Sequence, residues 1–221
     1  MPHSNGLLAH DWKRTLCILK EGNRRFVCNQ TLHRDTSEQG RLILADGQQP
    51  IAVVVTCSDS RVSPEIFFDQ TLGDIFVVRN AGNIADDTAL GAIEYAVKYL
   101  RAPLVVVVGH NHCGAVAAAY EQHQQESGHG GYGRIKDNLS PKGGSKQLDC
   151  EYDHEPPACL QSVLDVIRLS LKDISGLDGA VVDNILYAVA RIQNNETVKN
   201  AGTKVLGATY CLVTGEVSFL S

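Results

Sequence analysis

The sequence contains no apolar run long enough to cross a membrane. A membrane-spanning helix needs about 20 consecutive apolar residues, whereas the longest apolar runs, such as Ile51–Val55 and Leu104–Val108, have the length of a strand. The first ten residues lack the basic, apolar and small-residue segments of a secretory signal. We therefore expect a soluble, cytoplasmic protein with no membrane partner.

The sequence also has no excess of positive charge, and its number of cysteines is odd. The 221-residue chain has a net charge of −5, and because a nucleic-acid partner requires a basic face, we expect none. Seven cysteines cannot all pair within one chain, and a cytosolic protein keeps its thiols reduced. We expect Cys17, Cys28 and Cys211 to pack as small apolar residues. Cys57 and Cys113 stand in a different sequence context.

Three β-branched apolar runs predict strands that are covered on both faces. Between the second and third of these runs, apolar residues spaced along residues 88–100 predict a helix. Strands that alternate with helices indicate a parallel sheet with right-handed crossovers. Two later runs flank the turn at Thr214-Gly215 and predict an antiparallel hairpin at the sheet edge. In chain order, the five strands are expected at Ile51–Thr56, Ile75–Val78, Leu104–Val108, Lys204–Leu212 and Val217–Leu220.

The remaining patterns predict one α/β domain over residues 1–221, with a helical arm at 1–47 and a core at 48–221. The central sheet should have about four parallel strands and one antiparallel edge strand, flanked by helices. Residues 122–157 are too long for an ordinary connection, so this segment is a functional loop or contains short helices. The other helices are expected at Asp11–Val27, Thr36–Ala45, Cys159–Leu171 and Val181–Asn194.

Three side chains that can bind a metal follow two of the predicted strands. Cys57 follows the first strand, and His110 and Cys113 follow the third. Ligands of open α/β sheets collect at the carboxyl ends of the strands. Two thiolates and one imidazole suit Zn²⁺ and leave a fourth position for water. Cysteines at strand ends are more often packing residues, however, so the spacing alone leaves both interpretations open.

An acid and a base follow Cys57 at a spacing that suits an ion pair. Asp59 and Arg61 can form a charge-assisted pair with two parallel hydrogen bonds. Such a pair has a functional interpretation, in which it serves a neighbouring metal, and a structural one, in which it anchors the turn.

Two motifs in the correct order give this chain a specific resemblance. Cys57-x-Asp-Ser-Arg61 followed by Gly109-His110-x-x-Cys113-Gly114 resembles the paired signature of the β-class carbonic anhydrases. Nearly the whole chain is similar to that family, with a patchy match over residues 122–157. Further similar segments are Gly22-Asn23-x-Arg25-Phe26, Val78-Arg-Asn-Ala-Gly-Asn83, Ala92-Ile-Glu-Tyr-Ala-Val97, and Gly207-x-x-Tyr210 with Thr214-Gly215.

The resemblance implies an activity and a role for each motif residue. The activity would be reversible hydration of carbon dioxide to bicarbonate and a proton through zinc-bound hydroxide. One Zn²⁺ per subunit would be held by Cys57, His110 and Cys113. Asp59 would accept a hydrogen bond from the hydroxide, and Arg61 would hold that carboxylate away from the metal.

The resemblance also implies a substrate pocket that two subunits share. The residues at the matching positions are Gln48, Phe76, Ala81, Tyr95 and Gly114. A homodimer or a dimer-based oligomer would be the functional unit, with the N-terminal helices packing on the partner subunit. For Phe76 and Tyr95, ordinary core packing remains an alternative.

Some family members have a regulatory bicarbonate site with a tryptophan three residues before the first cysteine ligand. Val54 occupies that position here, so we expect the site to be absent or impaired and Asp59 to stay paired with Arg61.

Two other functions remain open from the sequence. Relatives of the same fold act on carbonyl sulfide or carbon disulfide with the same metal site, although they tend to carry a Met-Asp-Ala-Arg segment where this chain has Ser58-Asp59-Ser60-Arg61. A non-catalytic zinc or redox module would use Cys57 and Cys113 as structural or oxidant-sensing thiols. Structural zinc sites normally have four protein ligands, whereas only three are expected to converge here, unless Asp59 is the fourth.

Overall fold

The structure, a computed structural model, describes residues 11–32, 36–126, 156–172 and 176–220. Its centre is a five-stranded sheet in the order β2-β1-β3-β4-β5. The first four strands in this order are parallel, and β5 pairs antiparallel with β4. The predicted α/β fold with an antiparallel edge strand is confirmed. The strands are β1 (Ala52–Cys57), β2 (Ile75–Asn80), β3 (Leu104–His110), β4 (Lys204–Tyr210) and β5 (Val217–Phe219).

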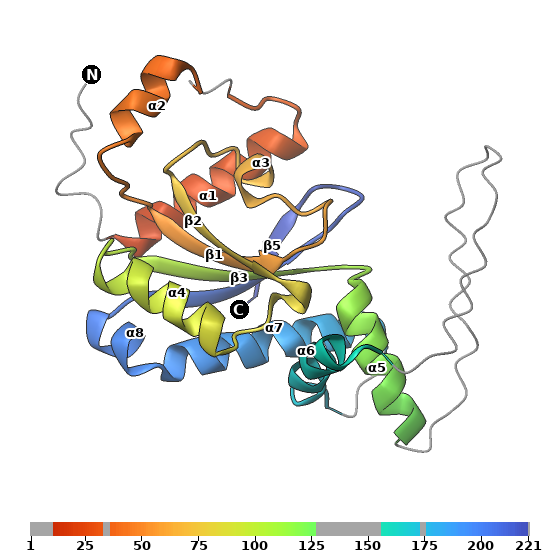
Figure 1. The fold of residues 1–221 in the computed structure, drawn as a ribbon. Helices are drawn as coiled ribbons and strands as arrows, with labels where there is room; N and C mark the ends of the chain where they lie inside the picture. The colour runs from red at the N-terminus through yellow and green to blue at the C-terminus, as the bar shows by residue number, and fades with distance from the viewer. Residues whose placement is uncertain (1–10, 33–35, 127–155, 173–175, 221) are drawn as a thin grey trace.

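Helices cover both faces of the sheet, as Figure 1 shows. One face carries α1 (Trp12–Val27) and the short α3 (Pro64–Phe67), which pack together over the sheet. The opposite face is covered by α4 (Asp87–Lys98), α7 (Leu177–Asn194) and α8 (Glu196–Ala201). Two further helices, α5 (Gly114–Glu126) and α6 (Ala158–Arg168), pack against each other near the carboxyl end of the strands.

The alternation of side chains along β1 assigns its last residue to one of these faces. Val53, Val55 and Cys57 belong to the apolar cluster under α4 and α7. Ala52 and Val54 belong to the cluster under α1 and α3. Successive side chains of a strand point to opposite faces, so Cys57 lies on the α7 side of the sheet. All six residues of β1 are buried.

The first helix of the helical arm, α1, has the bounds that the sequence predicts to within one residue. Asp11 caps α1 by accepting a hydrogen bond from the Lys13 amide, as is usual for an N-cap aspartate. The helix α2 (Glu38–Leu44) is shorter than the predicted helix because its N-cap is Ser37. Within the described chain, α1 packs on its own sheet and buries Leu19.

One expectation from the sequence was wrong. Cys17 and Cys28 are exposed rather than packed as apolar residues, because the buried side of α1 is formed by other residues and Cys28 follows the last turn of the helix. The segment at 122–157 begins within a helix, since α5 continues through Glu126. Residues 127–155 of that segment lie outside the described residues.

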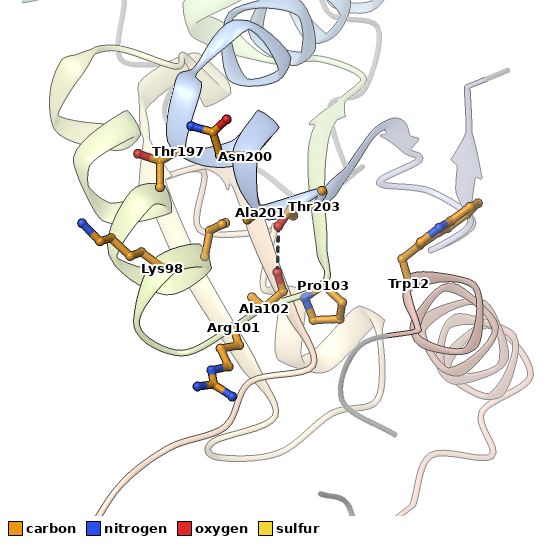
Figure 2. Close-up of a pocket in the computed structure, with 11 residues that line it drawn as sticks. Trp12, Lys98, Arg101, Ala102, Pro103, Thr197, Asn200, Ala201 and Thr203 are labelled. Atoms are coloured by element: carbon orange, nitrogen blue, oxygen red, sulfur yellow. Dashed lines mark hydrogen bonds between the residues drawn. The ribbon is translucent and has the colours of Figure 1, made fainter. Parts of the chain in front are cut away.

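A cavity of about 520 Å³ lies at the amino-terminal edge of the sheet. Figure 2 shows Ala102 and Pro103, which precede β3, beside Ala201 and Thr203, which precede β4, with Trp12 across the opening. The Thr203 hydroxyl donates a hydrogen bond to the Ala102 carbonyl oxygen at 3.3 Å. This cavity is at the opposite edge from the side chains that carry the predicted chemistry. Among the described residues, no helix has both the length and the apolar character to cross a membrane.

Candidate metal centre

The three predicted metal ligands converge at the carboxyl ends of β1 and β3. Cys57 ends β1, His110 ends β3, and Cys113 lies just before α5. His112 adopts a left-handed backbone with φ of 54°, so the chain turns between His110 and Cys113 and both side chains reach the same space. Their ligand atoms and the Cys57 sulfur all lie within 4.8 Å of one another, and all three residues are buried.

The imidazole of His110 is oriented for metal binding. Its Nδ1 lies 2.9 Å from the Asn111 carbonyl oxygen, a contact that fixes Nδ1 as the protonated nitrogen and leaves Nε2 with a free lone pair. Nε2 is buried in a side chain with 0% exposure and has no hydrogen-bond partner. A buried polar atom without a partner costs free energy unless something binds it. The structure therefore fits a cation at this nitrogen.

The two sulfurs have the separation that a tetrahedral metal requires. Cys57 Sγ lies 3.8 Å from Cys113 Sγ, and zinc–sulfur bonds of about 2.3 Å at a tetrahedral angle place two sulfurs about 3.8 Å apart. Hydrogen bonding with Cys113 lowers the pKa of Cys57, whereas the same contact and burial raise the pKa of Cys113. Without a metal, the protein thus favours the thiolate at Cys57 and the protonated thiol at Cys113. A bound cation would favour the thiolate at both.

A backbone amide from the segment after β2 also faces the cluster. The short 3₁₀ turn η1 (Ala81–Asn83) brings the Gly82 N–H to 3.4 Å from Cys57 Sγ, to which it donates a hydrogen bond. No sequence pattern singles out this amide, because every residue except proline supplies an N–H. Donors to a ligating sulfur belong to the outer shell that tunes a metal site.

Asp59 and Arg61 form the ion pair that their spacing suggested. Arg61 Nε donates to Asp59 Oδ1 at 2.9 Å, and Nη2 donates to Oδ2 at 2.6 Å. This pair and the Arg61 amide, which also donates to the carboxylate, lower the pKa of Asp59 to about 2. Asp59 Oδ2 lies 4.0 Å from His110 Nε2. The carboxylate is therefore ionised and borders the space that Nε2 faces.

Arg79 holds the backbone of the loop that carries Asp59. Its Nε donates to the Cys57 carbonyl oxygen at 3.2 Å, and its Nη2 donates to the Asp59 carbonyl oxygen at 2.9 Å. The sequence alone did not predict this role for Arg79. Arg79 is the next-to-last residue of β2 and lies level with Thr56 in the β1–β2 register. This position at the end of the strand is the signal that points to its role.

The five residues aligned with the substrate pocket fall into two groups. Ala81 begins η1 beside Gly82, and Gly114 begins α5 beside Cys113. A Cβ added at Gly114 would meet no other atom within 4 Å. The other three residues lie elsewhere. Gln48 is exposed before β1, lining a cavity with Leu44 and Leu72, and Phe76 and Tyr95 contact each other with ring centroids 6.2 Å apart.

Comparisons with known proteins agree with this geometry. The family model described as "Carbonic anhydrase" matches residues 52–217. The carbonic anhydrase of Mycolicibacterium smegmatis is 38% identical over 227 residues, which cover 100% of this chain and 96% of that protein. Carbonic anhydrase 2 of Mycobacterium tuberculosis is 51% identical over 142 residues, which cover 64% of this chain and 66% of that protein.

Solved structures have the same fold. The β-carbonic anhydrase CcaA superposes with a TM-score of 0.61 at 25% identity, over 96% of both chains. A Coccomyxa β-carbonic anhydrase in complex with acetazolamide has a TM-score of 0.62 at 24% identity, over 95% of this chain and 86% of that one. A match over most of the chain, together with the convergence of two cysteines and a histidine at the ends of β1 and β3, shows that this chain belongs to the β-class carbonic anhydrase family.

Proposed function

We propose that this protein catalyses the reversible hydration of carbon dioxide to bicarbonate and a proton, with one Zn²⁺ per subunit. The family supports the reaction, and the donor set supports the metal. The observation that carries the proposal is the unpartnered, buried Nε2 of His110 beside two sulfurs 3.8 Å apart. Cys57, His110 and Cys113 would hold the ion and leave one position open to solvent.

The metal and the protein contribute different parts of the chemistry. When bound, zinc lowers the pKa of a water in the open position so that a nucleophile exists near neutral pH. The two cysteine sulfurs supply negative charge that offsets the charge of the ion. His110 is held in one tautomer by the Asn111 carbonyl, so its Nε2 stays available as a ligand without a proton.

Asp59 is the group of this chain that orients the nucleophile. Its carboxylate stays ionised because Arg61 binds both oxygens, so it can only accept a hydrogen bond. By accepting a hydrogen bond from the nucleophile, Asp59 would direct an oxygen lone pair toward the carbon of the substrate. Arg61 fixes the carboxylate in the loop, which keeps Asp59 paired and away from the position of the metal.

The substrate pocket would be completed by a second copy of the chain. Ala81 and Gly114 adjoin the ligands of their own chain, whereas Gln48, Phe76 and Tyr95 would serve the centre of the partner. Tyr95 is 47% exposed and its neighbour Tyr99 is 65% exposed, with ring centroids 5.5 Å apart. Two adjoining exposed tyrosines favour an interface, because aromatic side chains are enriched at such surfaces. This arrangement supports a homodimer or a dimer-based oligomer as the functional unit.

Metal analysis combined with stopped-flow hydration tests the proposal. Purified protein should contain about one zinc per chain, lose its hydration activity on chelation and recover it when zinc is restored. Well-folded protein that contains no metal and stays inactive after zinc is added would refute the proposal. Turnover of carbonyl sulfide measured on the same sample separates the hydratase from a hydrolase of the same fold, because the hydratase should turn over carbon dioxide faster.

A further inference from the structure

Asn184 is a buried polar side chain on α7 that contacts the loop beside the metal ligands. It is 2% exposed, and its Nδ2 donates a hydrogen bond to the Gly82 carbonyl oxygen at 2.7 Å across 102 residues of sequence. A buried amide is costly unless its hydrogen bonds are made. The partner it uses is the same residue whose N–H donates to Cys57 Sγ.

Two glycines allow α7 to approach closely enough for this contact. A Cβ at Gly109 in β3 would lie 2.7 Å from Ile185, and a Cβ at Gly207 in β4 would lie 2.8 Å from the same side chain. Only the lack of a side chain at both positions lets Ile185 pack directly on the sheet. Asn184 is the adjacent residue on the helix, so this packing fixes its height above the strand ends.

Gly82 is itself confined to the conformation that the contact requires. Its φ is 72°, a left-handed value that favours glycine. A Cβ there would lie 2.6 Å from the Ile167 side chain of α6. Asn83 follows with φ of 47°. Two successive left-handed residues are an uncommon backbone, and they persist only where the surroundings hold them.

We propose that Asn184 is a positioning residue of the metal centre, which aims the Gly82 N–H at Cys57 Sγ by holding the Gly82 carbonyl. The proposal rests on the metal site of the proposed function. It extends that site to a residue that reaches the ligand Cys57 only through Gly82. The Asn184 amide fixes the peptide on one side of Gly82, and the N–H on the other side is thereby directed to the sulfur. This donor restrains the sulfur and moderates the electron density that it gives to a metal.

The test compares metal binding by the wild-type protein and by Asn184→Leu, which keeps a similar volume but removes the donor. Competition with a chromophoric chelator should give a zinc dissociation constant about tenfold higher in the variant. In the Co²⁺-substituted protein, the sulfur-to-cobalt charge-transfer band should shift to lower energy, because the sulfur loses a hydrogen-bond donor. A folded Asn184→Leu protein with an unchanged dissociation constant and an unchanged band would overturn the proposal.

A matched control separates positioning from general loss of stability. Asn23 is also a buried asparagine with hydrogen bonds to main-chain atoms, at Phe67 and Gly215, but it lies on α1 over the opposite face of the sheet. Asn23→Leu should lower the melting temperature without moving the cobalt band. A shift as large as that of Asn184→Leu would mean that any buried defect disturbs the centre, and this would also overturn the proposal.

A measurement on the wild-type protein covers the case in which Asn184→Leu does not fold. In protein loaded with ¹¹³Cd, a scalar coupling between the metal and the Gly82 amide proton would report the N–H···S hydrogen bond directly. The coupling should be present in the wild type and absent or smaller in Asn184→Ser, whose side chain is too short to reach Gly82. If the wild type binds none of these metals, the proposed function fails; if it binds them without the coupling, only this inference fails.

Discussion

The metal cradle, formed by Cys57, His110 and Cys113, differs from the residues aligned with the substrate pocket. One chain supplies the whole cradle but would supply only part of the pocket. Cys57, His110 and Cys113 are buried, and their ligand atoms lie within 4.8 Å of one another. Gln48 and Tyr95, by contrast, lie on the surface of the same chain. The sheet alone brings soft donor atoms together at the strand ends. A pocket for a small apolar substrate would also need side chains that surround it. Under the proposed function, metal binding would therefore be a property of one chain, and substrate binding would depend on two.

Replacing one donor of the cradle should have the largest effect. Cys57→Ala removes one of the three ligands and should lower the hydration rate by about 1,000-fold or more, because the metal that activates water is lost. Stopped-flow hydration and metal content measured on the same sample check this expectation. Cys211→Ala, at a half-buried cysteine outside the cluster, is the matched control and should keep both zinc and activity. Retained zinc and activity in Cys57→Ala would mean that the cradle is not the catalytic centre.

Removing the charge of Asp59 should separate metal binding from catalysis. Asp59→Asn keeps the shape of the side chain but loses the carboxylate that Arg61 holds, and we expect kcat to fall about 100-fold with zinc retained. Asp87→Asn, at a carboxylate 99% exposed on α4, is the control and should be neutral. An Asp59→Asn protein with wild-type kcat would favour a structural zinc module over a hydratase.

A change on the exposed aromatic surface should affect activity through association. Tyr95→Ala removes a ring that contacts both Phe76 and Tyr99, and it should weaken self-association and lower the hydration rate about tenfold at micromolar protein concentration. Sedimentation velocity and metal analysis check that the oligomer changes while zinc stays bound. Leu169→Ala, at a residue 69% exposed just after α6, is the control. A monomeric Tyr95→Ala protein with full activity would remove the proposed role of the second subunit.

The sequence predicts the sheet and the metal ligands for the same physical reason. A strand buried on both faces must be apolar along its length, so β1 and β3 are visible as valine-rich runs. Their carboxyl ends define where ligands gather, and the residues there are cysteine and histidine. The spacing of apolar residues does not predict α5. This helix buries only Val116 and Ala119, so its sequence has little apolar periodicity.

The contacts that support the ligands could not be predicted in this way. Asn184 is an ordinary polar residue in a helical pattern, and its partner Gly82 is 102 residues away. The contact exists because Ile185 packs on Gly109 and Gly207, which are two positions on different strands. Only the three-dimensional packing of α7 brings these features together. Long-range hydrogen bonds of this kind leave no local pattern in the sequence.

The smallest expected effect concerns the pH dependence of stability. It tests whether Arg61 holds the Asp59 carboxylate beside the metal cradle in solution. Arg61 lowers the pKa of Asp59 from its usual 3.8 to about 2. A carboxylate with a lowered pKa in the folded state stabilises the protein at pH values above its unfolded pKa, and the contribution is lost as the pH falls toward 2. Because the Arg61 side chain is 57% exposed, solvent screens the pair and its contribution should be below about 1 kcal/mol.

Urea unfolding of the wild type and of Asp59→Asn at pH values from 7 to 3 measures this contribution. The difference between the two proteins should be constant from pH 7 to pH 5 and should shrink between pH 4 and pH 3, as the unfolded wild-type chain begins to bind its proton at Asp59. Both proteins should be free of metal, so that ligand binding does not mask the effect. A difference that stays constant down to pH 3 would mean that Asp59 is not held by Arg61 in solution, and the carboxylate would then be free to move toward the metal.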